Sequence, residues 1–119
     1  MRIWYSGEGD VAVREADIQR QILDYLAARH IWHRRMNSGA AMLPGKGGKL
    51  RPVRFGAAGM PDILVRGANG TVVWIEVKSA KGKQSPAQRR WQEDAEGFGD
   101  IYILARSVED VMVLFEGKT

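Results

Sequence analysis

Three charged residues lie at the ends of two apolar runs near the middle of the chain. Asp62 precedes the run 63–65, and the run 72–77 contains Glu76 and ends before Lys78. An Asn-Gly pair between the runs is typical of the turn of a β-hairpin. Because side chains alternate along a strand, Glu76 and Lys78 point to one side, and Asp62 lies close enough across the hairpin to join them. The hairpin therefore predicts two acids and a lysine at one site.

An acid, an acid and a lysine together suit the metal-assisted hydrolysis of a phosphodiester. The carboxylates of Asp62 and Glu76 would bind a hard cation, Mg²⁺ or Mn²⁺, and the backbone carbonyl of Val77 would add a ligand. The cation polarises the phosphoryl group and lowers the pKa of a bound water, while Lys78 orients that water or stabilises developing charge. The alternative is a cross-strand ion pair at a solvated sheet end, which contributes little to stability.

The sequence around these residues resembles a known group of nucleases. The Pro-Asp pair at 61–62, followed by Glu-Val-Lys at 76–78, resembles the core motif of the PD-(D/E)xK nucleases. The preceding Gly59 and the later stretch 82–88 (GKQSPAQ) are more narrowly similar to the VRR-NUC (virus-type replication-repair nuclease) family. The resemblance covers nearly the whole chain. It implies an α/β fold with a mixed central β-sheet flanked by helices on both faces.

The same resemblance implies two further site residues. In the family a glutamate of the first helix faces the metal, and Glu15 is the matching residue. Its helical spacing places it near Ile18 and Ile22, on the buried side of the first turn, where an acid also complements the helix N-terminus. Gln88 matches a glutamine beside the active site, but it also fits a capping box with Ser85. We expect one amide to serve only one of these roles at a time.

Basic residues are segregated along the chain. The net charge is +4, and no acidic residue occurs between Asp24 and Asp62. Charge of one sign gathered in this way suits a polyanion, although a solvated basic face has the same composition. We expect the interval 34–54 to flank the cleft as a phosphate-binding wall. The candidate DNA-binding residues, in this interval and in the basic turn after Lys78, are Arg34, Arg35, Lys46, Lys49, Arg51, Arg54, Lys81 and Lys83.

Periodicity and turn residues predict the elements that position the site. In chain order these are a helix from residue 14, strands over 31–36 and 51–55, the hairpin, a helix over 85–97 and a strand over 100–105. We expect the basic segment 44–49 to be a flexible loop, which either closes over a DNA backbone or forms the tip of a hairpin. The segment 107–116 fits either a helix or an edge strand.

Composition sets the broad class. A chain of 119 residues is expected to form one domain, spanning 1–119. Its 45% hydrophobic and 27% charged residues are those of a soluble globular protein, and the lack of cysteine excludes disulfides and thiolate metal sites. With no signal peptide and no apolar run of membrane-spanning length, we expect an intracellular, cytoplasmic protein without a membrane partner, in the host cytoplasm if the origin is a phage.

The resemblance implies a metal-dependent DNA endonuclease. Short family members of viral or mobile-element type look like homodimers that cleave four-way (Holliday) junctions, and a two-fold pair matches a junction that needs two cuts. Apolar segments at 4–5, 40–43 and 113–115 are candidates for the dimer contact. The alternatives are a less selective nickase or restriction-type nuclease, and a catalytically silent nucleic-acid-binding module. The intact acids argue against the silent module, because binding alone does not need acids facing a polyanion.

Overall fold

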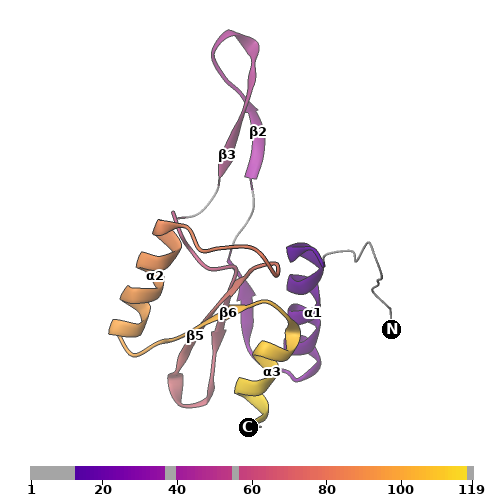
Figure 1. The fold of residues 1–119 in the computed structure, drawn as a ribbon, viewed down its shortest axis with the longest axis vertical. Helices are drawn as coiled ribbons and strands as arrows, with labels where there is room; N and C mark the ends of the chain where they lie inside the picture. The colour runs from indigo at the N-terminus through magenta and orange to yellow at the C-terminus, as the bar shows by residue number, and fades with distance from the viewer. Residues whose placement is uncertain (1–12, 37–39, 55–56, 118–119) are drawn as a thin grey trace.

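The fold is an α/β arrangement seen in a computed structural model, which describes residues 13–36, 40–54 and 57–117 (Figure 1). Two single 3₁₀ turns, η1 (Lys46–Gly48) and η2 (Ala68–Gly70), join pairs of strands. The helices and strands, in chain order, are α1 (Glu15–Ala28), β1 (His33–Arg35), β2 (Ala40–Pro44), β3 (Leu50–Arg54), β4 (Ile63–Arg66), β5 (Val72–Val77), α2 (Pro86–Gly97), β6 (Ile101–Ala105) and α3 (Val108–Glu116).

The central sheet has the strand order β1-β4-β5-β6. The first two pairings are antiparallel, and β5 pairs with β6 in parallel through the connection that contains α2. The predicted β4–β5 hairpin is confirmed. In its turn Asn69 has φ 68° and Gly70 has φ 77°, the left-handed conformations that a tight hairpin turn requires. The sheet is therefore mixed, as expected.

Helices cover both faces of the sheet. On one face, α1 and α3 pack over an apolar core of Ile18, Ile22, Leu26, Ile63, Val65, Val73, Ile75, Val77, Ala105 and Val111. On the other face lies α2, whose Trp91 ring meets the Trp74 ring of β5 edge to face, with centroids 5.4 Å apart. Figure 1 shows α2 and α1 on opposite sides of the strands. The alternating strand residues thus divide into an α1/α3 face and an α2 face.

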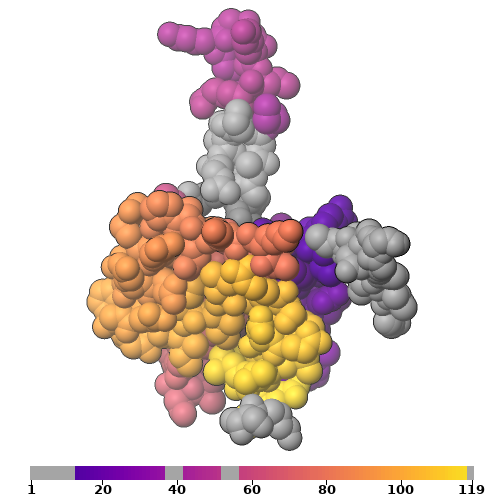
Figure 2. All heavy atoms as spheres, in the orientation of Figure 1, coloured from indigo at the N-terminus to yellow at the C-terminus, as the bar shows by residue number. Residues whose placement is uncertain are grey.

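The basic segment 44–49 is the tip of a second hairpin, which is one of its two predicted forms. β2 pairs with β3 in a separate two-stranded sheet, in which Gly45 N donates to Lys49 O at 2.7 Å. The strand 40–44 was not expected, because its Ala-Ala-Met-Leu-Pro sequence has low intrinsic strand preference and forms a strand through pairing with β3. This hairpin projects well away from the rest of the molecule (Figures 1 and 2).

The carboxyl-terminal segment, which fitted helix or strand, is the helix α3. Val111 is fully buried, and Val108 and Phe115 pack beside it on the core, so the spacing follows one helical face. Asp110 accepts a hydrogen bond from Arg106 N at 2.9 Å at the start of the helix. No helix in the described part of the chain is long and apolar enough to cross a membrane.

Candidate active site

The two acids of the site are neighbours across the β4–β5 ladder. Ile63 lies opposite Ile75, so Asp62 and Glu76 are the next pair toward the open end of the hairpin. Both isoleucines face the core, and alternation therefore places both acids on the α2 face. Both carboxylates are buried. Asp62 Oδ2 accepts a hydrogen bond from Val77 N at 2.8 Å, which fixes its orientation at the strand end.

Lys78 follows on the same side of β5, as the alternation predicted. Its Nζ lies 3.9 Å from Glu76 Oε2, and only 13% of its side chain is exposed. Its backbone N donates to Ala105 O at 2.9 Å, so the parallel pairing with β6 continues to this residue. The ammonium group is thus held beside Glu76 on a largely buried side chain.

Gln88 corrects the expectation that one amide serves a single role. Its backbone N donates to Ser85 Oγ at 3.1 Å, and its Oε1 accepts from Ser85 N at 2.8 Å, which completes the capping box. At the same time its Nε2 donates to Glu76 Oε2 at 2.9 Å. The two ends of an amide carry an acceptor and a donor, so both roles hold together. The first turn of α2 is therefore bonded directly to the acidic site.

Gly59 permits this close approach of α2. It has φ +79°, and a Cβ on it would lie 2.4 Å from Ala87 O and 3.0 Å from Gln88 N. A residue with a side chain at this position would be strained in its backbone and would collide with the backbone of the helix. The glycine that precedes Asp62 thus lets the loop pack directly on the N-terminus of α2.

Glu15 lies elsewhere than its helical spacing predicted. The side chain is exposed rather than on the buried side, and its Oε2 accepts from Ser79 N at 3.4 Å. The first turn of α1 sits beside the loop that follows β5, where Glu15 Oε2 and Lys78 both approach Gly82. Because α1 covers the face opposite to Asp62, Glu15 meets the end of the strand and not the acid pair. Its role as a metal ligand stays a prediction.

Sequence reasoning missed a polar network next to the acids. Gln84 Nε2 donates to Tyr102 Oη at 3.2 Å and to Gln92 Oε1 at 2.9 Å. Tyr102 pairs in register with Trp74 and so lies on the α2 face. Burial raises the pKa of Tyr102 to about 12, with smaller effects from the carboxylates of Glu76 and Asp62, while the Gln84 hydrogen bond opposes the rise. In the sequence, Tyr102 stood out only as part of the predicted strand 100–105.

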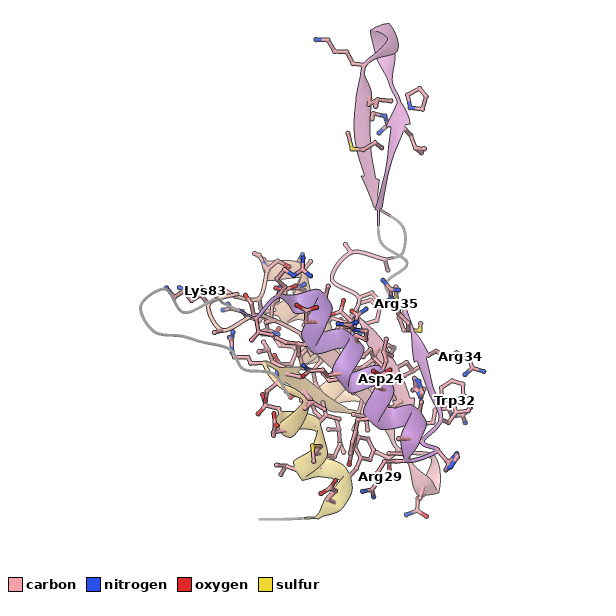
Figure 3. All side chains as sticks on the ribbon, turned by 90° about the vertical axis from the view of Figure 1, so that its right-hand side faces the viewer. Asp24, Arg29, Trp32, Arg34, Arg35 and Lys83 are labelled. Carbon is pink, nitrogen blue, oxygen red and sulfur yellow. The ribbon has the colours of Figure 1, made fainter. Side chains whose placement is uncertain are left out.

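Arg106 is a second residue that the sequence did not point to. Its Nη1 donates to Ser79 O, to Gly82 O at 2.9 Å and to Ala80 O at 3.2 Å. One guanidinium nitrogen therefore donates hydrogen bonds to three carbonyls of the turn after Lys78. Lys81 and Lys83 are exposed on this turn, and Figure 3 shows Lys83 at the outside of the molecule.

The basic interval 34–54 does not form one wall. Arg34 and Arg35 are exposed on β1, at the edge of the central sheet. Lys46, Lys49 and Arg51 are exposed on the projecting hairpin. The interval is divided because residues 40–54 leave the central sheet and pair with themselves. The side chain of Arg54 lies outside the described residues.

The acid pair has the chemistry of a site for a hard divalent cation. Carboxylate oxygens are the ligands that Mg²⁺ and Mn²⁺ prefer, and Asp62 and Glu76 are buried neighbours on one face of the sheet. In the part of the chain that the structure describes, no three His, Cys, Asp or Glu side chains stand close enough to share a metal ion. A cation at Asp62 and Glu76 would thus complete its coordination with backbone carbonyls, such as that of Val77, and water.

Comparisons with known proteins agree with this geometry. The family model described as the VRR-NUC domain matches residues 13–109. A solved structure described as a VRR_NUC domain is similar to this chain with a TM-score of 0.60 at 24% identity, over 88% of this chain and 97% of that one. At this identity the likeness shows the fold, and it agrees with the predicted mixed central β-sheet flanked by helices. A search of curated proteins gave no match.

Proposed function

The chain belongs to the VRR-NUC family, and on this basis we propose that it is a divalent-metal-dependent DNA endonuclease that cleaves branched DNA, four-way junctions in particular. The family match assigns a nuclease-type function. The observation that carries the finer proposal is the buried pair of Asp62 and Glu76, with Lys78 Nζ 3.9 Å from Glu76 Oε2. Two buried acids beside a lysine suit hydrolysis of a phosphodiester better than simple binding of a polyanion.

In this proposal the two acids bind a divalent cation, and the cation activates the phosphate and the water. Asp62 and Glu76 would hold Mg²⁺ or Mn²⁺, with the carbonyl of Val77 as a further ligand. When bound, the cation supplies a polarised phosphoryl group and a bound water of lowered pKa. The backbone N–H of Val77 holds Asp62 in place, so this ligand is already oriented before substrate binds.

Lys78 and Gln88 act on the charges around that pair. The ammonium group of Lys78 stabilises negative charge that develops on the phosphate, or orients the attacking water. Gln88 donates to Glu76 Oε2 and so fixes the rotamer of that carboxylate. Because Gln88 is tied to Ser85 by the capping box, the helix α2 holds the site from one side.

Metal dependence and the role of the acids are tested in one cleavage assay. Labelled duplex, flap, fork and four-way junction DNA are incubated with protein and Mg²⁺, Mn²⁺ or a chelator. We expect the wild-type protein to cleave the junction with Mg²⁺ or Mn²⁺ and not with the chelator. We expect Asp62→Asn and Glu76→Gln to lose cleavage while their DNA binding is unchanged or slightly tighter. Glu93→Gln, which neutralises an exposed acid of α2, is the matched control and should cut normally. Near-normal cleavage by both site variants would refute the assignment.

We further propose that the working unit is a homodimer, since symmetric resolution of a junction needs two cuts. Apolar side chains support this reading: Met42, Leu43 and Leu50 are exposed on the projecting hairpin, and Val113 and Leu114 are exposed on α3. Trp4 and Tyr5 lie outside the described residues. Sedimentation velocity should give twice the 13.3 kDa of one chain. A monomer that nicks one strand at each encounter would leave the nickase alternative.

A further inference from the structure

An exposed tryptophan stands between two arginines at the open edge of the central sheet. Trp32 precedes β1 and is 42% exposed. The guanidinium carbon of Arg34 lies 4.6 Å from the centre of its ring, and that of Arg66 lies 5.7 Å from it. These distances are those of cation–π contacts. Figure 3 shows Trp32 and Arg34 pointing outward from β1, away from α1.

This cluster shares a sheet face with the catalytic acids. In the β1–β4 ladder Arg34 pairs with Leu64, and in the next ladder Leu64 pairs with Trp74, which contacts α2. Residues opposite one another in register point to the same face, so Arg34 is on the α2 face. Trp32 lies two positions before Arg34 and Arg66 two positions after Leu64, so alternation places both on this face as well. The acids lie on that same face.

The cluster and Asp62 lie at opposite ends of the β1–β4 ladder. At the acid end, Met36 N donates to Asp62 O at 2.7 Å, and at the other end Arg66 N donates to Trp32 O at 3.3 Å. The four steps along the chain from Trp32 to Met36 span about 13 Å at the rise of a β-strand. The helix α2 packs on β5 and β6 of this face, and β1 is the edge strand farthest from it in the sheet.

The charge of the cluster formed by Trp32, Arg34 and Arg66 suits a polyanion. Within the described residues, neither Arg34 nor Arg66 forms an ion pair with a carboxylate. No carboxylate of these residues therefore competes with phosphate for either guanidinium group. Trp32, whose ring both groups contact, is 42% exposed. An aromatic face beside cationic side chains is the arrangement that binds single-stranded nucleic acid, by stacking of a base and pairing with its phosphates.

We propose that Trp32, Arg34 and Arg66 form a stacking site for an unpaired nucleotide of the DNA substrate. The site rests on the proposed nuclease function, and it specifies the substrate: DNA with a single-stranded or unstacked nucleotide about 13 Å from the cleaved bond. A base stacked inside a duplex cannot reach the ring, because both its faces are covered by neighbouring bases. The site would thus favour branch points and ends over continuous duplex.

Binding without cleavage tests this proposal directly. A fluorescent oligothymidylate is titrated with protein in a chelator, and the affinity is compared with that for a blunt duplex. We expect Trp32→Ala to weaken oligothymidylate binding by about 5- to 150-fold and duplex binding by less than about twofold. Trp32→Phe, which keeps an aromatic face, should retain most of the affinity. Phe98→Ala removes another aromatic ring, 86% exposed and at the end of α2, and is the control expected to bind normally.

A second measurement uses the unaltered protein and does not depend on how the variants fold. An oligonucleotide of abasic sites keeps the phosphates but offers no base to stack. We expect the wild-type protein to bind it as weakly as Trp32→Ala binds oligothymidylate. Equal affinity for the abasic and the thymidine oligonucleotides would overturn the proposal. So would a loss in Trp32→Ala no larger than that in Phe98→Ala, or an effect of Trp32→Ala on self-association alone.

The outcome is separable from the nuclease assignment. If the wild-type protein cleaves no DNA but oligothymidylate binding depends on Trp32, the stacking site stands and the endonuclease proposal fails. If Glu76→Gln abolishes cleavage while Trp32→Ala binds normally, the endonuclease stands and the stacking site fails.

Discussion

Replacing Gly59 by alanine tests whether the close packing of α2 on the loop before Asp62 holds the site together. The new Cβ would lie 2.4 Å from Ala87 O, so the helix must retreat by about 1 Å to reach van der Waals distance. That movement would stretch the bond from Gln88 Nε2 to Glu76 Oε2 from 2.9 Å to a length outside the hydrogen-bonding range.

Two costs follow from this movement. A residue with a Cβ in the left-handed region costs about 1–2 kcal/mol. A lost hydrogen bond to a charged group costs about 1.5–3 kcal/mol. We therefore expect Gly59→Ala to lower the free energy of unfolding by about 2.5–5 kcal/mol. Displacement of Glu76 at the reacting centre should slow cleavage by about 10²-fold.

Thermal unfolding and junction cleavage measure the two effects. The control is Gly97→Ala in α2, where an added Cβ meets nothing within 4 Å and helix preference predicts a gain of up to about 1 kcal/mol. We expect the melting temperature of Gly59→Ala to lie roughly 10 °C or more below that of the control. If the two variants melt together and both cleave at the wild-type rate, the tight contact between Gly59 and α2 does not position the site.

Two further predictions concern Tyr102 and the projecting hairpin. The pKa of Tyr102 is raised from 10.0 to about 12 in the folded protein. Between these pH values the unfolded chain has lost a proton that the folded protein keeps. The free energy of unfolding therefore falls as the pH rises, by about 1.4 kcal/mol per pH unit at most. Urea unfolding at several pH values should show this fall in the wild type and a smaller one in Tyr102→Phe, and parallel curves would contradict it. Lys46→Gln with Lys49→Gln should weaken binding of all DNA forms alike and reduce the salt dependence, by about 0.9 in the log–log slope for each phosphate that the lysines no longer neutralise. An unchanged slope would show that the hairpin lysines do not bind phosphates.

The acid pair and the hairpin that carries it could be predicted because their signals are local. The Asn-Gly turn and the alternation of β5 determine where Glu76 and Lys78 point, and the structure agrees. Gln88 was found by its spacing from Ser85, but its two simultaneous bonds follow from how close α2 comes to Glu76, which is a tertiary distance. Spacing along a chain does not supply that distance.

The features that were missed depend on partners distant in sequence. Arg106 bonds carbonyls 24 to 27 residues away, and Gln84 reaches Tyr102 across 18 residues. The strand β2 has weak strand preference by itself and forms through its pairing with β3. Glu15 was placed on the buried side because its helical period fits Ile18 and Ile22, yet its side chain is exposed and accepts a hydrogen bond from Ser79 N, 64 residues away.

The alternation of β4 and β5 also determines which changes of chain length the protein can accept. Ile63 and Ile75 are fully buried on one face, and the acids occupy the next positions on the other. Deleting one residue within β4 would turn Asp62 toward the apolar core and expose Ile63, because a shift of one position exchanges the two faces. Burying a carboxylate in place of an isoleucine costs several kcal/mol. We therefore expect insertions and deletions to be tolerated in the turn between the strands, outside the ladder, and to be excluded from the strands themselves.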